Sequence, residues 1–233
     1  MADHGDNSPA RPGAGGTASG SPSFDVLLLD FGGVLIDYAA GPRLLEWLNH
    51  SITADELWRR WLLSPSVRGF ECGAIGPEQF AADLCREFQL PVSPSQFIEE
   101  FAVWPRALFP GTRELLSALR PHFTLASFSN TNVLHWNHVR TNLQLVDLFD
   151  HHFPSHLIRM LKPDREAFDH IVKTTGCSPE RILFLDDNPL NVEGAQRAGL
   201  TARRVDGPAA IASVLEEYGI QIAPAVRAAG ALR

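Results

Sequence analysis

Three short runs of apolar residues, each followed at once by polar side chains, constrain the fold of this chain most. They occupy 24–37, 123–130 and 181–188, with the sequences FDVLLLDFGGVLID, FTLASFSN and RILFLDDN. Short continuous runs rich in Val, Leu and Ile are typical of strands buried on both faces. Helical patterns at 112–120 and 163–176 lie between the runs. Strands alternating with helices predict an α/β fold with a Rossmann-like parallel sheet core.

The segment 38–104 differs from the rest, because it carries helical patterns and no strand pattern. Apolar residues recur at spacings of three and four, and Thr53 and Ser95 are candidate N-caps. We therefore expect an all-helical cap domain at 38–104, inserted into an α/β core formed by 24–37 and 105–222.

The two ends of the chain differ in composition from this core. Residues 1–23 are mostly Gly, Ala, Pro and Ser and contain no large apolar residue beyond Met1, so we expect a disordered tail there. Residues 223–233 are expected to form a C-terminal tail. The first residues lack the features of a secretory signal, and no run approaches 18 apolar residues. We expect a protein that is neither exported nor inserted in a membrane.

The charge and the cysteine content of the chain indicate which partners, metal sites and cell compartments are expected. The chain has 20 Lys and Arg against 27 Asp and Glu, a formal net charge of −7, and its basic residues are scattered. This disfavours nucleic acid or an anionic membrane as a partner. Three cysteines without a C-x-x-C pair suggest neither a disulfide framework nor a thiolate zinc site. A cytoplasmic location is expected, and the oligomeric state is left open.

Polar residues follow each predicted strand, and in a parallel sheet ligands bind at the carboxyl ends of the strands. Together these residues offer a nucleophile, a hydroxyl group, a cation and acidic ligands for Mg²⁺, which is the set that phosphoryl transfer through a carboxylate needs. They are Asp30, Ser129, Asn130, Lys162, Asp186 and Asp187.

In this order the motifs resemble the haloacid dehalogenase-like hydrolase superfamily. The resemblance covers about 24–205, and the helical insert is similar to the superfamily's first type of cap. Gly32 and the spacing of the later motifs resemble the branch that contains the bacterial alpha-D-glucose-1-phosphate phosphatase. The motifs are DFGGVL (30–35), SFSNTN (127–132), LKPD (161–164) and FLDDNPLNVEGAQRAGL (184–200).

The resemblance implies a Mg²⁺-dependent phosphatase that acts on a small phosphorylated metabolite, such as a sugar phosphate. Asp30 would be the nucleophile that becomes an aspartyl phosphate, Ser129 would bind a phosphoryl oxygen, and Lys162 would hold nucleophile and phosphate together. Further contacts to the substrate would come from the Gly33 and Asn130 amides, Thr131 and His135.

The resemblance also implies a metal site. Asp187, one oxygen of Asp30 and the Gly32 carbonyl would bind Mg²⁺ directly, and Asp186 would bind it directly or through a water. Two adjacent carboxylates repel each other unless a cation or hydrogen-bond donors compensate, which agrees with such a site.

Gly32 is a departure from the superfamily pattern. Most of its phosphatases carry at this position a second Asp, which protonates the leaving group, a contribution of about 10² to 10⁴-fold. Without it, leaving groups that need little protonation are favoured, such as those of sugar 1-phosphates, aryl phosphates and acyl phosphates. His135 is the first candidate for a substitute acid, whereas Asp37 is more typical of a turn or hinge residue.

Two other functions fit parts of the pattern. A 2-haloacid dehalogenase uses the same nucleophile without a metal and also lacks the second Asp, but the pair Asp186 and Asp187 argues against it. A phosphate-ligand or protein-binding module with decayed catalysis is the other alternative. The intact nucleophile and Lys162 argue against that reading.

Overall fold

The core of the protein is a parallel sheet of five strands in the order β5-β4-β1-β6-β7. The computed structural model describes residues 24–38 and 40–221, so the tails expected at 1–23 and 223–233 lie outside the described residues. The α/β fold class is confirmed. The strands are β1 (Val26–Leu29), β4 (Thr124–Ser129), β5 (His151–Pro154), β6 (Ile182–Asp186) and β7 (Thr201–Arg204).

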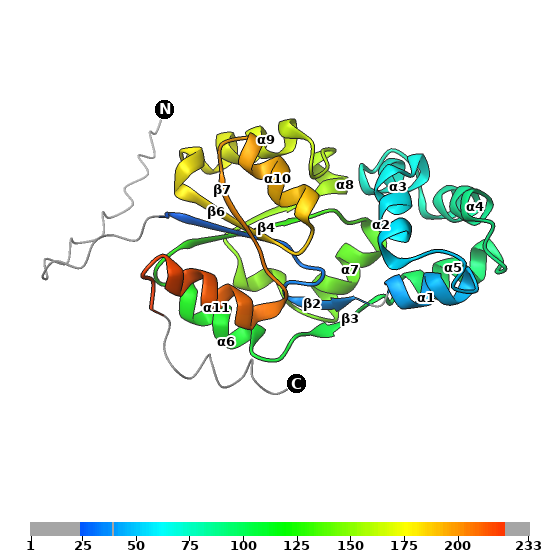
Figure 1. Cartoon of the computed structure of the whole chain (residues 1–233), viewed down its shortest axis with the longest axis horizontal. Coiled ribbons are helices and arrows are strands. Elements are labelled where there is room, and N and C mark those ends of the chain that lie inside the picture. Colours follow the sequence, from blue (N-terminus) through cyan, green and yellow to red (C-terminus); the bar gives the residue numbers. More distant parts are fainter. Residues whose placement is uncertain (1–23, 39, 222–233) are drawn as a thin grey trace, which may run out of the picture.

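The central strand β1 is buried on both faces, as its sequence VLLL predicts. Side chains alternate along it. Leu27 and Leu29 pack into one apolar cluster with α6 (Thr112–Leu119) and α11 (Gly207–Glu217). On the other face, Val26 and Leu28 pack with α9 (Arg165–Thr175) and α10 (Pro189–Arg197). Figure 1 shows these two helical layers on either side of the sheet.

The expected helical segment contains five helices, which lie beyond the carboxyl ends of the strands (Figure 1). Aromatic side chains such as Phe80, Phe97 and Phe101 form an apolar cluster of its own. Among the described residues no helix is both long and apolar enough to cross a membrane. The division of the chain at 38 and 104 stays a prediction. The helices are α1 (Ala40–Trp47), α2 (Ala54–Leu63), α3 (Pro65–Glu71), α4 (Pro77–Phe88) and α5 (Pro94–Phe101).

The caps of these helices agree in part with the expectation. Thr53 caps α2, because its side chain accepts a hydrogen bond from the amide of Glu56. The N-cap of α5 is Ser93 and not Ser95. Pro94 takes the first helical position, which suits its fixed φ, and this moves the cap one residue upstream of it.

Two short strands join the helical segment to the core. β2 (Ile36–Tyr38) and β3 (Pro105–Leu108) pair antiparallel, with Asp37 opposite Ala107. The sequence patterns indicated no strand after β1 before 123, so this sheet is an addition to the expected fold. It places Tyr38 on a strand that leads from the sheet edge into the helices.

Candidate active site

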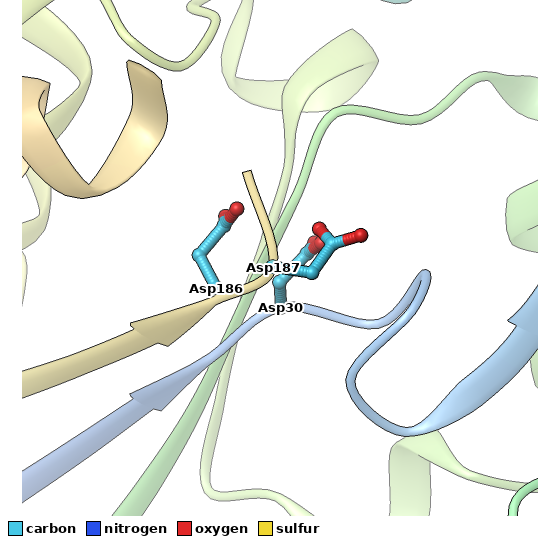
Figure 2. Close-up of side chains that lie close together, drawn as sticks. All are labelled: Asp30, Asp186 and Asp187. Atoms are coloured by element: carbon cyan, nitrogen blue, oxygen red, sulfur yellow. The ribbon is translucent and has the colours of Figure 1, made fainter. Parts of the chain in front are cut away.

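Three carboxyl groups meet at the carboxyl edge of the sheet. Asp30 follows β1, Asp186 ends β6, and Asp187 comes next. One oxygen of each lies within 4.8 Å of the others. The parallel register causes this, since Leu29 pairs with Leu185 and the Asp30 amide donates to the Leu185 carbonyl at 3.0 Å. Figure 2 shows all three side chains extending beyond the ends of the two strands.

Lys162 is buried among these carboxylates, with 1% of its surface exposed. Its Nζ donates to Asp30 Oδ1 at 2.8 Å, to Asp186 Oδ2 at 2.7 Å and to the Phe128 carbonyl at 2.9 Å. These contacts use all three ammonium hydrogens. Burial opposes the charge of Lys162, but Asp186 and Asp30 outweigh it and raise its pKa. Lys162 therefore stays cationic beside three acidic groups, which leaves the cluster with excess negative charge.

Asp186 is fully buried, and both its oxygens accept protein hydrogen bonds. Besides Lys162, the Asn188 amide donates to Oδ1 at 2.8 Å, and Asn191 Nδ2 lies 3.0 and 3.1 Å from the two oxygens. Asp186 thus fixes both Lys162 and the start of α10. The sequence patterns gave Asn191 no role. Asn191 lies in the first turn of the helix that follows the acidic pair, and this position was the signal in the sequence that could have identified it.

The negative charges of Asp187 and Asp30 have fewer compensating partners than that of Asp186. Burial, together with the charges of Asp30 and Asp186, raises the pKa of Asp187 to about 7. Burial likewise raises the pKa of Asp30 to about 6, although Lys162 acts in the opposite direction. None of the described residues donates a hydrogen bond to the Asp187 carboxylate. Hard oxygen donors with uncompensated charge suit Mg²⁺, so these residues fit that ion.

The loop after β1 is shaped around Asp187. Gly33 has a positive φ of 71°, and a Cβ there would lie 2.7 Å from Asp187 Cγ. Glycine is therefore required for this close approach. Its amide donates to the Ile36 carbonyl at 3.0 Å, so it is not free to bind a phosphoryl oxygen as expected. The amide that reaches the Asp30 carboxylate is that of Phe31.

At the end of β4, Ser129 has a free hydroxyl group, whereas the next two residues, Asn130 and Thr131, are held by hydrogen bonds. Ser129 lies at the strand end, and its hydroxyl makes no hydrogen bond within the described part of the chain. The Asn130 side chain accepts from the Lys162 amide and donates to the Lys162 carbonyl, both at 2.9 Å. Thr131 bonds through its amide and carbonyl to the Ser155 hydroxyl, at 2.8 and 2.9 Å. Asn130 therefore positions Lys162, and Ser129 is the group available to a ligand.

His135 lies in α7 (Val133–Thr141), where both ring nitrogens have protein partners. Its Nε2 is 2.6 Å from the Phe101 carbonyl, which can only accept, so Nε2 carries the proton. Its Nδ1 then accepts from the Tyr38 hydroxyl at 2.8 Å and from Asn132 Nδ2 at 3.1 Å. Burial lowers the pKa of His135 to about 3. It is neutral and fully bonded, and it is not presented to a substrate as expected.

Tyr38 lies next to Gly32, the position where the second Asp of the superfamily pattern is missing. A Cβ at Gly32 would have Tyr38 Cγ as its nearest contact, at 3.9 Å. The sequence patterns did not indicate this contact, because it depends on the path of β2. The hydroxyl hydrogen of Tyr38 points to His135, so the ring fills space here without presenting a proton.

Most of this chain is similar in sequence to known hydrolases. The family model for haloacid dehalogenase-like hydrolases matches residues 24–199. A sesquiterpene phosphatase from Aspergillus oryzae is 29% identical over 184 residues, which cover 76% of this chain and 88% of the relative. A flavin mononucleotide hydrolase from Arabidopsis thaliana is 27% identical over 157 residues, which cover 66% of this chain and 62% of that protein.

Solved structures show the same fold. A haloacid dehalogenase family enzyme from Bacteroides thetaiotaomicron, crystallised with magnesium and inorganic phosphate, is 25% identical, with a TM-score of 0.63. The likeness covers 78% of this chain and 93% of that enzyme.

Proposed function

The chain belongs to the haloacid dehalogenase-like hydrolase family and is a Mg²⁺-dependent phosphatase, and we propose that it acts through an aspartyl phosphate formed on Asp30. The observation that carries this proposal is the ion pair of Lys162 with Asp30 and Asp186 at the strand ends. It holds one carboxylate oxygen of Asp30 in place at the end of β1, and the neighbouring strand β4 ends with the free hydroxyl of Ser129.

Each residue has a distinct part in the proposed reaction. An oxygen of Asp30 attacks phosphorus, and the bond from phosphorus to the ester oxygen breaks. Lys162 offsets the negative charge that gathers at the nucleophile, and the Ser129 hydroxyl donates to a phosphoryl oxygen. Water then attacks the aspartyl phosphate, which releases phosphate and restores the Asp30 carboxylate.

The metal site follows from which oxygens are free. Asp187, one oxygen of Asp30 and the Gly32 carbonyl would hold Mg²⁺, and Asp186 would reach it through water because its own oxygens already have protein donors. When bound, Mg²⁺ supplies positive charge that stabilises the phosphoryl oxygens. Its charge also offsets the repulsion that raises the pKa of Asp187 and Asp30.

For the substrate we propose a small phosphomonoester, with sugar 1-phosphates as the first class to test. Gly32 supports this choice, because an anomeric oxygen leaves more easily as an anion than an ordinary alkoxide does. The two named relatives act on different molecules according to their names, so neither supplies the substrate. The free thiols of Cys72, Cys85 and Cys177 support a reducing location such as the cytoplasm.

A phosphate-release screen tests the proposal. Sugar 1-phosphates, sugar 6-phosphates, nucleotides, flavin mononucleotide and prenyl phosphates are assayed with and without Mg²⁺, and 2-haloacids are assayed for halide release. We expect Mg²⁺-dependent phosphate release that Asp30→Asn eliminates. Halide release without metal would support the dehalogenase alternative, and binding of phosphomonoesters without turnover would support the decayed module.

A further inference from the structure

His135 bonds to both of the places where the chain passes between the sheet and the helices. The chain enters the helical segment after Tyr38, the last residue of β2, and leaves α5 at Phe101. The Tyr38 hydroxyl donates to His135 Nδ1 at 2.8 Å, and His135 Nε2 donates to the Phe101 carbonyl at 2.6 Å. These partners are 97 and 34 residues away from His135 in the sequence. One imidazole ring on α7 therefore joins the entry and the exit of the helical segment.

Packing around the ring reinforces both hydrogen bonds. His135 is 3% exposed, and its ring stacks on that of Phe101 with the centroids 4.1 Å apart. The Tyr38 ring meets it edge-on, with the centroids at 5.5 Å. The preceding residue, Leu134, packs against the aromatic cluster of the helical segment. Because the site is buried, a partner that loses its hydrogen bond here is left unpaired, which makes the contact a strong one.

The first and last helices of the segment are joined close to these two crossing points. Arg43 in α1 donates through Nε and Nη2 to the two carboxylate oxygens of Glu100 in α5, at 2.6 and 2.9 Å. A two-pronged pair of this kind fixes orientation as well as distance. Since α1 follows Tyr38 and Glu100 precedes Phe101, the orientation set at His135 extends into the helices.

On the side of the sheet, His135 is fixed to the loop after β4. Ser129 ends β4, and α7 begins after the N-cap Asn132. The Asn132 Oδ1 accepts from the amides of Leu134 and His135, both at 3.1 Å, and its Nδ2 donates to His135 Nδ1 at 3.1 Å. Asn132 thus orients both the backbone and the ring of His135. The same short loop therefore carries the free hydroxyl of Ser129 and the contact that holds the helices.

We propose that His135 is a positioning residue, which sets the helical segment over the carboxyl edge of the sheet and so determines how the ester group of the substrate is bound. The inference rests on the proposed function, in which Asp30, Lys162 and Ser129 contact the phosphoryl group. The helices lie beyond that edge of the sheet (Figure 1), where they cover the part of a substrate that extends away from the phosphate. A change at His135 should therefore weaken binding of the ester group and leave binding of phosphate intact.

The protonation state of His135 suits a permanent contact. Burial lowers its pKa to about 3, although the hydrogen bond to the Phe101 carbonyl acts in the opposite direction. The neutral ring has one donor and one acceptor nitrogen, and the protein uses both. His135 can therefore fill this role without touching the substrate or exchanging a proton with it.

The test compares variants of His135 and Tyr38 in the full chain with Mg²⁺. His135→Leu keeps a buried apolar side chain and loses both hydrogen bonds, Tyr38→Phe loses one, and His135→Gln keeps an amide donor for the Phe101 carbonyl. Steady-state hydrolysis of p-nitrophenyl phosphate gives kcat and KM. Inorganic phosphate, used as a competitive inhibitor, gives the affinity of the phosphate site alone. His122→Phe, at an exposed His before the opposite end of β4, is the matched control.

We expect His135→Leu to raise KM about tenfold or more, because a buried carbonyl loses its donor, and to change the inhibition constant of phosphate by less than about twofold. His135→Gln should restore most of the loss. Tyr38→Phe should raise KM by a smaller factor, and it should add little in the His135→Leu background, because both substitutions break the same bond. The control should match wild type.

Hydrogen exchange without substrate tests the position of the helices independently of catalysis. The amides of β2 and β3 should exchange faster in His135→Leu than in wild type, because the strands that join helices and sheet lose their fixed point. The amides of β1 and β6 should keep their wild-type rates. Should His135→Leu fail to fold, Tyr38→Phe and His135→Gln undergo the same measurements.

A fall in kcat alone, or equal weakening of substrate and phosphate binding, would show a general structural role and overturn the proposal. Unchanged exchange in β2 and β3, or faster exchange in all strands, would overturn it as well. Failure of the proposed function has a different signature, in which wild type releases no phosphate from p-nitrophenyl phosphate. The exchange rates then still decide whether His135 holds the two crossing points.

Discussion

Lys162 Nζ lies between Asp30 and Asp186, 2.8 Å from Oδ1 of the first and 2.7 Å from Oδ2 of the second. A single buried cation thus connects the ends of two adjacent strands. Asn130 holds the backbone of Lys162 from a third strand end, so the contacts that orient the nucleophile also close the edge of the sheet.

Replacement of this cation should therefore affect stability as well as activity. Lys162→Met leaves two buried carboxylates without their partner, and we expect a loss of about 3 to 5 kcal/mol in the free energy of unfolding. Urea denaturation at neutral pH measures it. Arg197→Met, on an exposed pair with Glu193, is the control and should change stability by less than about 1 kcal/mol. Similar losses in both variants would show that Lys162 does not organise the site.

Asp30→Asn should remove turnover and keep the fold. The amide has nearly the same volume but no nucleophilic oxygen, so we expect phosphate release to fall on the order of 10³-fold or more. Stability without metal should not fall at neutral pH, because the substitution also removes a charge from an acidic cluster. Steady-state assays and thermal unfolding of the same preparation measure both. Substantial residual turnover would exclude the covalent mechanism.

Without metal, stability should fall as pH rises. The pKa values of Asp30 and Asp187 are raised from 3.8 to about 6 and about 7, so the folded protein binds more protons than the unfolded chain between these limits. The protonated forms are favoured by folding, and the loss is complete above about pH 7. Thermal unfolding from pH 4 to 8 with and without Mg²⁺ should show this slope only without the ion. A slope unchanged by Mg²⁺ would place the metal elsewhere.

Asp187→Asn tests the metal ligand itself. Removal of a group behind a metal ligand typically costs about 10- to 100-fold in metal affinity, and removal of a direct charged ligand should cost no less. The half-saturating Mg²⁺ concentration for activity should rise accordingly, and isothermal titration with Mg²⁺ gives an independent value. An exposed control on α2, Asp55→Asn, should leave both unchanged.

The sheet and its acidic edge were predictable because both depend on local patterns. Buried strands such as β1 and β6 are continuous apolar runs, and the polar residues that end them meet wherever such strands pair in parallel. The edge strands β5 and β7 were not predicted, because HHFP and TARR are short and partly exposed and carry no apolar run.

The rest of the site depends on how distant segments pack. The end of α3 contacts the core through Arg68, which pairs with Asp164, and the loop after it does so through Gly73, and neither contact has a signature in the local sequence. His135 follows the SFSNTN motif as predicted, but its environment comes from Tyr38 and Phe101, which are far away in the sequence. These partners bind both ring nitrogens of His135, so it cannot serve as the acid that the sequence suggested.

Gly32→Asp provides the last prediction. The backbone at Gly32 does not have a positive φ, and the nearest contact of a Cβ there is Tyr38 Cγ, at 3.9 Å, so the position accepts a side chain without backbone strain. If no acid protonates the leaving group in the wild type, an acid introduced at position 32 should supply the proton. We expect Gly32→Asp to cleave an alkyl phosphate about tenfold or more faster than wild type, and to make the rate of phosphoenzyme formation depend less on leaving-group pKa. Gly32→Asn fills the same space without an acid and should gain nothing. Equal gains by Asn and Asp would show that bulk at position 32, and not a proton, limits the wild type.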